Sequence, residues 1–315
     1  MTTAAVCVAG ATGYLGRRVV AELRARSLPV VAIARRRSDK PILRQLSGLG
    51  ATLAYVDASL KEPYSIVLVG VQTAITCLAA SNAKGSSTDD FWTIDRDANI
   101  RFCLDAILAG ATQVILVATF EGRASRHLTA FSEAKEQAVD EVRKACRDAH
   151  VAFTVIRPTA YFSDLTDRAF EGVLKTGRHT VIGDGSHRIN PIAGEDVAST
   201  IADCVELPER AGKEYPIGGP DIFTFGGIGE LAAQVIGTQA SLTIKQVPLG
   251  RLRLMALSAS IAGTVSRRAR RISALLKWMI YSSTHDAVAP ASGKRRLRDE
   301  FLDKLRKADA SAQPV

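Results

Sequence analysis

The stretch Ala5-Val-Cys-Val-Ala-Gly10-Ala-Thr-Gly13-Tyr-Leu-Gly16 decides the fold class of this chain. Its first five residues predict a buried strand, and residues 16–26 form an amphipathic stretch that predicts a helix. Gly10 permits a tight turn, Gly13 lets the backbone approach a pyrophosphate, and Gly16 allows close packing of helix on strand. The helix N-terminus adds N–H groups and a favourable dipole. The stretch therefore predicts a dinucleotide-binding turn formed by Gly10, Thr12, Gly13, Tyr14, Leu15 and Gly16.

Strands and helices alternate through the first half of the chain. Short apolar runs predict strands at 30–34, 52–56, 74–78, 113–118 and 153–156, and amphipathic stretches predict helices at 42–49, 64–69, 95–109 and 132–149. Strands separated by helices are typical of an α/β protein with a Rossmann-type, doubly wound parallel sheet. After Pro158, glycine-rich pieces separate shorter elements, which predicts a small C-terminal substrate-binding subdomain.

This pattern of strands and helices divides the chain into three regions. Residues 1–158 are expected to form the dinucleotide-binding domain, and residues 159–308 the substrate-side elements and a C-terminal cap. Within the cap, residues 251–282 are expected to form a basic, apolar helical stretch and residues 297–307 a short amphipathic helix. Residues 309–315 are expected to be a disordered tail.

The second predicted strand ends in Arg35-Arg36-Arg37-Ser38. A site for NAD usually places Asp or Glu here to accept from the ribose 2′-hydroxyl. Three guanidinium groups instead suit a 2′-phosphate, which they bind through charge-assisted hydrogen bonds. The alternative is an ordinary solvated charge run. The sequence therefore favours NADP(H), with Asp57 after the third strand placed to reach the adenine or serving as a plain turn residue.

The helix at 132–149 is preceded by Phe131 and contains Lys135. Short-chain dehydrogenases/reductases carry Tyr-x-x-x-Lys here, where the tyrosine protonates the substrate oxygen and the lysine binds ribose and lowers the tyrosine pKa. This chain keeps the lysine and lacks the phenol, and Ala118-Thr119 replaces the partner serine. A carbonyl reductase of the usual type is therefore disfavoured. Lys135 is a candidate ribose ligand, with an exposed helix lysine as the alternative.

Two further segments are expected beside the nicotinamide. Leu78 and Ala79 follow a predicted strand, and Pro158 follows another within Arg157-Pro-Thr-Ala-Tyr161-Phe162. Tyr161 is a candidate catalytic residue, as a substitute proton donor, with a packing aromatic as the alternative.

These motifs together resemble the atypical short-chain dehydrogenases/reductases of NmrA-like type, and among them most closely the divinyl chlorophyllide 8-vinyl reductases. The resemblance runs from about residue 5 to 305 and is carried by residues 10–16, 34–38, 77–81, 131–135, 157–162, 183–185, 190–192, 196–198 and 216–220. The chain departs from those reductases at Ala118, where they carry serine, and at residues 120–122.

The resemblance implies hydride transfer from NADPH to a conjugated C=C or C=N bond in a pigment-like or specialised-metabolite substrate. No tyrosine is needed if the conjugated system delocalises the charge. Two other functions stay open. One is a redox-neutral reaction, such as a cyclisation or isomerisation, with Asp164, Glu121 or Asp184 as the acid. The other is a non-catalytic NADP(H)-sensing or assembly protein.

The charge of +9 is unevenly distributed. Residues 1–250 hold 27 basic and 27 acidic residues, whereas residues 251–315 hold 14 and 5. Because the first 250 residues carry no net charge, the sequence argues against nucleic acid as the partner. Arg267, Arg268, Arg270 and Arg271 lie between apolar segments, a pattern that suits a helix meeting an anionic or hydrophobic small-molecule substrate, or a membrane surface. A solvated basic face is the alternative.

Five dispersed cysteines without a CxxC pair indicate reduced thiols, and no metal site is expected. No signal peptide is apparent. The uncharged segment 63–83 reads as a helix followed by a buried strand and not as a membrane span. We therefore expect a cytoplasmic protein with peripheral membrane contact through its basic C-terminal helix.

Overall fold

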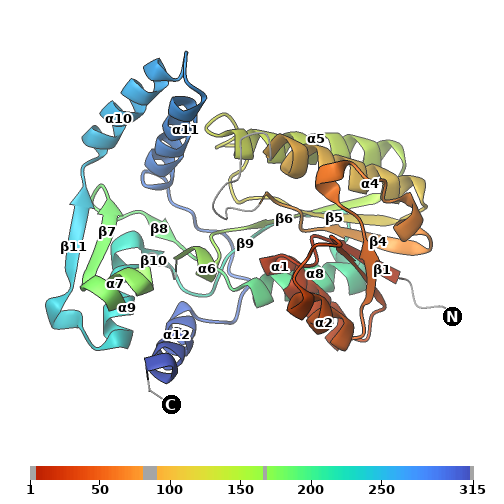
Figure 1. The fold of residues 1–315 in the computed structure, drawn as a ribbon, viewed down its shortest axis with the longest axis horizontal. Helices are drawn as coiled ribbons and strands as arrows, with labels where there is room; N and C mark the ends of the chain where they lie inside the picture. The colour runs from red at the N-terminus through yellow and green to blue at the C-terminus, as the bar shows by residue number, and fades with distance from the viewer. Residues whose placement is uncertain (1–4, 81–90, 166–168, 313–315) are drawn as a thin grey trace. The chain divides into compact units, whose positions relative to one another are not determined.

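A computed structural model describes residues 5–80, 91–165 and 169–312, and its contacts divide the chain into two units (Figure 1). The first unit comprises Met1–Arg157 and Gly194–Pro216, and the second comprises Pro158–Ala193 and Ile217–Val315. The first boundary falls within one residue of the expected position at 158. Residues 194–216, expected on the substrate side, instead return to the first unit, because helix α8 (Gly194–Glu206) packs on helix α1 (Tyr14–Ala25).

The first unit is built on a seven-stranded sheet in the order β3-β2-β1-β4-β5-β6-β9. The strands are β1 (Ala5–Ala9), β2 (Val30–Ala34), β3 (Thr52–Tyr55), β4 (Val71–Thr76), β5 (Gln113–Val117), β6 (Ala152–Pro158) and β9 (Glu214–Ile217). Strand β1 pairs in parallel with both β2 and β4, so the strand order reverses beside β1. Ligands of open α/β sheets bind beyond the carboxyl ends of the strands at this reversal. The predicted fold class is confirmed.

Helices cover both faces of this sheet. Helices α1, α2 (Lys40–Gly48) and α8 lie on one face, and α4 (Asn99–Leu108) and α5 (Ala130–Asp148) lie on the other (Figure 1). Short 3-10 helices are found at Ala58–Leu60, Ser65–Leu68 and Pro208–Arg210. The second of these, followed by β4, accounts for the uncharged stretch at 63–83 over its described residues; residues 81–83 lie outside them.

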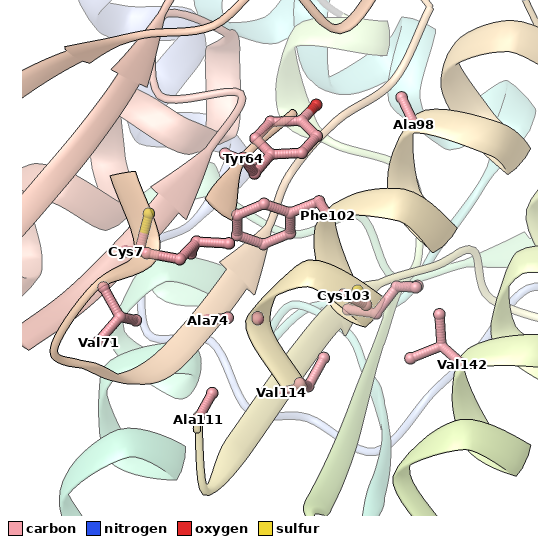
Figure 2. Packing of buried hydrophobic residues seen from close by; sticks show 14 of the residues in the cluster. Cys7, Tyr64, Val71, Ala74, Ala98, Phe102, Cys103, Ala111, Val114 and Val142 are labelled. Atoms are coloured by element: carbon pink, nitrogen blue, oxygen red, sulfur yellow. The ribbon is translucent and has the colours of Figure 1, made fainter. Parts of the chain in front are cut away.

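In the core beneath α4 and α5, strand residues such as Cys7, Ala74 and Val114 pack with helix residues such as Phe102, Cys103 and Val142 (Figure 2). Cys7 and Ala74 on the sheet leave room for Phe102, whose ring meets the Tyr64 ring edge-on at 5.2 Å. Both aromatic residues are almost fully buried. Edge-to-face pairs of this kind add to the stability gained from burial, so the core anchors α4 against the central strands.

The helix expected over residues 95–109 begins earlier and in a different form. Residues Phe91–Ala98 form a π-helix that leads into α4. Helices of this kind are frequent at functional sites, because the extra residue per turn redirects side chains. Here Asp95 is completely buried.

The second unit holds two small sheets and six α-helices among its described residues. Strand β7 (Arg178–Ile182) pairs in parallel with β11 (Thr243–Val247), and β8 (Arg188–Ile189) pairs antiparallel with β10 (Phe223–Thr224). The helices are α6 (Phe162–Leu165), α7 (Glu171–Thr176), α9 (Phe225–Ile236), α10 (Leu249–Ala262), α11 (Arg267–Ser282) and α12 (Leu297–Ala312). Phe170 and Phe301, with ring centroids 5.3 Å apart, lie in its core.

Two expectations for the C-terminal region are corrected. The stretch 251–282 is two helices, because α10 ends at Ala262 with Gly263 as its C-cap, and Ser266 caps the start of α11 by accepting the N–H of Ala269. Residues 309–312 are helical and not disordered, since alanines, which favour helix, continue α12. Residues 313–315 lie outside the described residues. Over the described part of the chain, no helix combines the length and apolar character needed to cross a bilayer.

Candidate functional site

The glycine turn between β1 and α1 has the geometry of a backbone cradle. Gly10 has a φ of +76°, and a Cβ there would lie 2.8 Å from the carbonyl oxygen of Cys77. A Cβ on Gly16 would lie 2.1 Å from the carbonyl oxygen of Gly10, so only glycine lets α1 start this close to the strand. Gly13 is exposed and precedes the first turn of α1. The turn therefore fits a pyrophosphate held by backbone N–H groups.

The other predicted residues of the turn differ in exposure. Thr12 and Tyr14 are half-buried, and Leu15 is buried under the helix. The Tyr14 ring lies 3.9 Å from the guanidinium carbon of Arg18, which also bonds to Glu195 of α8 at 2.9 Å. These contacts fix the start of α1, and with it the direction of its N-terminal N–H groups.

The arginine run after β2 faces solvent. Arg35, Arg36 and Arg37 are all exposed, and the Ser38 hydroxyl accepts the N–H of Arg35 at 3.2 Å. The N–H of Ser38 also donates to the Arg35 carbonyl at 2.9 Å. This tight turn gathers three exposed cations at the carboxyl end of β2, which is the position expected for groups that bind a 2′-phosphate.

Asp57 lies next to this group of arginines. Its carboxylate accepts from the N–H and hydroxyl of Ser59, at 3.0 and 2.6 Å, and lies 3.2 Å from an Arg37 nitrogen. Burial alone would raise the pKa of Asp57, but the Ser59 hydrogen bonds and the positive charges of Arg37 and Arg35 outweigh it and lower that pKa. Asp57 is therefore an anion that orients Arg37, in addition to its expected position near the adenine.

Lys135 is buried, with 3% of its surface exposed. Its Nζ donates to the carbonyl oxygen of Leu78 at 2.9 Å and lies 2.9 Å from Asp95 Oδ1. The Leu78 residue is half-buried and its neighbour Ala79 is exposed. The structure therefore brings together Lys135 and the end of β4, two parts of the predicted cofactor site that are far apart in the sequence.

Asp95 and Asn99 belong to this network, and the sequence reasoning missed both. Asp95 Oδ2 accepts the N–H of Ala80 at 3.0 Å, while Asn99 Nδ2 donates to the carbonyls of Leu78, Ile94 and Asp95. Both residues are completely buried. The sequence did contain a sign of this network. Positions 95, 99, 102, 103 and 106 lie on one face of a helix, and Asp95 and Asn99 are the two polar residues on that otherwise apolar face.

Phe131 lies one turn before Lys135 on α5. Its ring meets the Phe91 ring edge-on, with centroids 5.6 Å apart. The position that carries a phenol in the usual short-chain enzymes is therefore part of an aromatic contact between α5 and the π-helix. Lys135 has a carboxylate partner in place of a tyrosine partner.

A second buried ion cluster holds the neighbouring backbone. Arg157 donates to both carboxylate oxygens of Glu136, at 2.7 and 3.0 Å, and to the carbonyl of Thr119 at 3.0 Å. Arg157 also pairs with Glu214, which in turn pairs with Arg143 at 2.7 Å. Burial would lower the pKa of Arg157, but Glu136 and Glu214 raise it. The cluster ties α5, the end of β5, β6 and β9 together beside Lys135.

The remaining predicted residues lie in the second unit. Pro158 is buried, and Tyr161 is half-buried with its N–H donating to Asp164 Oδ2 at 3.1 Å. Asp184 is exposed and accepts from Ser186. The N–H and hydroxyl of Ser186 lower the pKa of Asp184, which disfavours that residue as an acid near neutral pH.

The cysteines are buried or half-buried thiols with no disulfide. Burial raises the pKa of Cys7 and Cys77 to about 12 and that of Cys146 and Cys204 to about 11, so these thiols are protonated and unreactive. Within the described ranges, no three His, Cys, Asp or Glu side chains converge on a metal position. Ser81, at the end of one motif, lies outside those ranges.

The chain has clear relatives. A family model described as NAD(P)H-binding matches residues 10–208. The chloroplastic divinyl chlorophyllide a 8-vinyl-reductase of Zea mays is 33% identical over 226 residues, which cover 68% of this chain and 55% of that protein. The Arabidopsis thaliana protein of the same name is 28% identical over 335 residues, covering 98% of this chain and 78% of that protein. The chain spans just over half the length of the first curated relatives that it matches.

The fold is also found in solved structures. The crystal structure of the NADPH-dependent quinone oxidoreductase QOR2 of Escherichia coli, complexed with NADPH, superposes with a TM-score of 0.70 at 17% identity, covering 95% of this chain and 99% of that chain. At this identity the likeness shows a shared fold. The shared fold, the family match and the glycine turn all support the same family assignment. The chain belongs to the NAD(P)H-binding family of atypical, NmrA-like short-chain dehydrogenases/reductases, a class of NAD(P)H-dependent oxidoreductases.

Proposed function

We propose that this chain is an NADPH-dependent reductase of a conjugated C=C or C=N bond in a pigment-like or specialised-metabolite substrate. The observation that carries the proposal is the replacement of the phenol by Phe131 next to a retained, buried Lys135. A substrate whose own conjugation spreads the negative charge needs no phenol at this position, and water or a weak acid completes the addition. An isolated carbonyl would need that proton donor.

The proposed cofactor contacts follow the geometry of the first unit. The glycine turn would hold the pyrophosphate. The 2′-phosphate would be bound by Arg35, Arg36, Arg37 and Ser38, and Asp57 would lie on the adenine side. Leu78, Ala79, Lys135 and Pro158 would border the nicotinamide and its ribose. Bound NADPH supplies a hydride. Exposed arginines in place of an acid after β2 support NADPH over NADH.

Lys135 would act on the ribose as a cation. Its Nζ lies 2.9 Å from Oδ1 of the completely buried Asp95, which holds the lysine side chain in place. In this proposal the lysine anchors the ribose and orients the nicotinamide, and it does not lower the pKa of a tyrosine. Tyr161 is the proposed substitute proton donor, with packing as its other role.

The relatives support an activated alkene as the substrate class. Two of them are named for the reduction of a vinyl group on a chlorophyllide. The vinyl group of such a pigment is conjugated with the macrocycle, which is the electronic situation that the missing phenol requires. An anionic or hydrophobic small molecule of this kind is the proposed substrate.

The test is a substrate panel with purified protein. Conjugated alkenes and imines, including a divinyl chlorophyllide, are incubated with NADPH or NADH, and absorbance at 340 nm is followed beside product mass. We expect NADPH consumption with an activated alkene or imine and none with simple ketones. Turnover without NADPH consumption would support a redox-neutral reaction, and NADPH binding without any turnover would support a sensing protein.

Phe131→Tyr is the informative variant. It restores the Tyr-x-x-x-Lys pattern, and the wild-type protein should be active without it. A wild-type protein that gains activity only after this substitution would be a decayed carbonyl reductase, contrary to the proposal.

A further inference from the structure

Helices α10 and α11 of the second unit carry an exposed apolar stripe. On α10, Leu254, Leu257 and Ile261 are exposed by 68, 59 and 67%, and Val265, in the turn after the helix, is exposed by 91%. The spacing of three and four residues places the first three on one side of α10, over about 10 Å of its length. Ile272, Leu275 and Trp278 on α11 are exposed as well. Large apolar side chains that repeat at helical spacing on a surface mark an interaction site.

The packing of the two helices does not use this stripe. Leu252 and Ala256 of α10 are buried together with Leu276 of α11, and the Ser260 and Ser273 hydroxyls are 2.7 Å apart. These residues form the contact between the helices. The stripe is therefore a second apolar face, which the described part of the second unit leaves exposed to solvent.

The same segment has a strong and uniform charge. Residues 249–282 contain seven basic residues and no acidic one: Arg251, Arg253, Arg267, Arg268, Arg270, Arg271 and Lys277. Arg268 and Arg270 are exposed and lie in the first turn of α11, where the helix dipole favours negative charge. Arg270 also donates to the carbonyl of Gly263 at 3.2 Å. An anionic partner would offset the unfavourable position of Arg268.

We propose that the α10–α11 hairpin docks on an anionic lipid bilayer, with the apolar stripe in the headgroup–acyl boundary and the basic side chains on lipid phosphates. An apolar face flanked by Lys and Arg is the composition of interfacial helices, and neither helix could span a bilayer. A second copy of this chain would bring the same cationic segment against itself. A nucleic acid would leave the apolar stripe uncovered.

The experiment is flotation of the full chain with vesicles of phosphatidylcholine alone or with 30% phosphatidylglycerol. We expect binding to the anionic vesicles, weakened in 0.5 M NaCl, and a blue shift of Trp278 emission in a Trp92→Phe background. The triple variant R251Q/R253Q/R268Q should lower the partition coefficient roughly a hundredfold, about fivefold for each basic side chain. The triple variant L257S/I261S/V265S should lower it at least tenfold.

Matched controls separate this surface from general effects. R44Q/K144Q/R147Q removes three exposed cations of the first unit, and I66S/L108S removes two apolar side chains there that are more than 80% exposed. Both should float like the wild type. Failure of the wild type to bind anionic vesicles overturns the proposal, and so does equal, salt-insensitive binding to phosphatidylcholine. Dissociation of an oligomer by the stripe variant, without vesicle binding by the wild type, would assign the surface to a second copy.

Discussion

The pair between Lys135 and Asp95 yields the sharpest prediction. Asp95→Asn keeps the size of the side chain but removes the charge opposite Lys135, whose side chain is 4% exposed. The lysine would keep the Leu78 carbonyl and a neutral amide oxygen as acceptors, but no carboxylate opposite its charge. Removal of one member of a buried ion pair costs about 3–5 kcal/mol. Since domains are stable by only about 5–15 kcal/mol, we expect a large fall in the free energy of unfolding.

A double-mutant cycle in urea at pH 7 isolates the pair. Lys135→Met alone leaves the buried Asp95 side chain without its lysine partner, so it should also be costly. The double variant D95N/K135M buries no charge at this position and should be less destabilised than the sum of the two single variants by about 3 kcal/mol. Lys144→Met, an exposed lysine on the same helix, is the control and should change stability by less than about 0.5 kcal/mol.

One outcome of the double-mutant cycle would contradict this prediction. A coupling energy below about 0.5 kcal/mol is what independent positions show. Such a value would refute the pairing of Lys135 with Asp95.

Three other predictions concern the cofactor and pH. Gly13→Asp places a carboxylate where the pyrophosphate is proposed, and NADPH titration should show affinity lower by on the order of 100-fold; normal affinity would remove the turn from the site. Arg35→Ala should weaken NADPH about 10- to 100-fold and NADH less than about threefold, and equal losses would argue against the 2′-phosphate contact. Burial lowers the pKa of His179 below 6.5, so the unfolded chain binds a proton more readily than the folded one. Stability should therefore decline as the pH falls below about 6.5, with a smaller decline in His179→Gln; identical declines measured by urea denaturation would contradict this.

Local sequence patterns were sufficient for the fold and for the position of the glycine turn. The periods of apolar residues identified the strands and most helices, because each period reflects which face of an element is buried. The turn at residues 10–16 could be recognised because its requirements are local. A positive φ at Gly10 and the close approach at Gly16 depend on residues a few positions apart.

The π-helix and the break after α10 were harder to predict. A π-helix differs from an α-helix by one residue per turn, a difference that apolar spacing over eight residues does not resolve. The return of residues 194–216 to the first unit was also missed. It depends on the fit of Gly194 against Tyr14 and Arg18, a contact between segments about 180 positions apart.

The sequence by itself determined that this chain folds around a parallel sheet with a glycine-rich turn after its first strand, and that Lys135 remains where the usual phenol is lost. Only the tertiary structure decided what surrounds that lysine. Asp95 meets Lys135 because the π-helix turns the carboxylate inward, and Arg157 meets Glu136 because β6 lies beside α5. Ion pairs in a protein interior depend on which distant side chains share a space without water, and one-dimensional patterns do not contain that information.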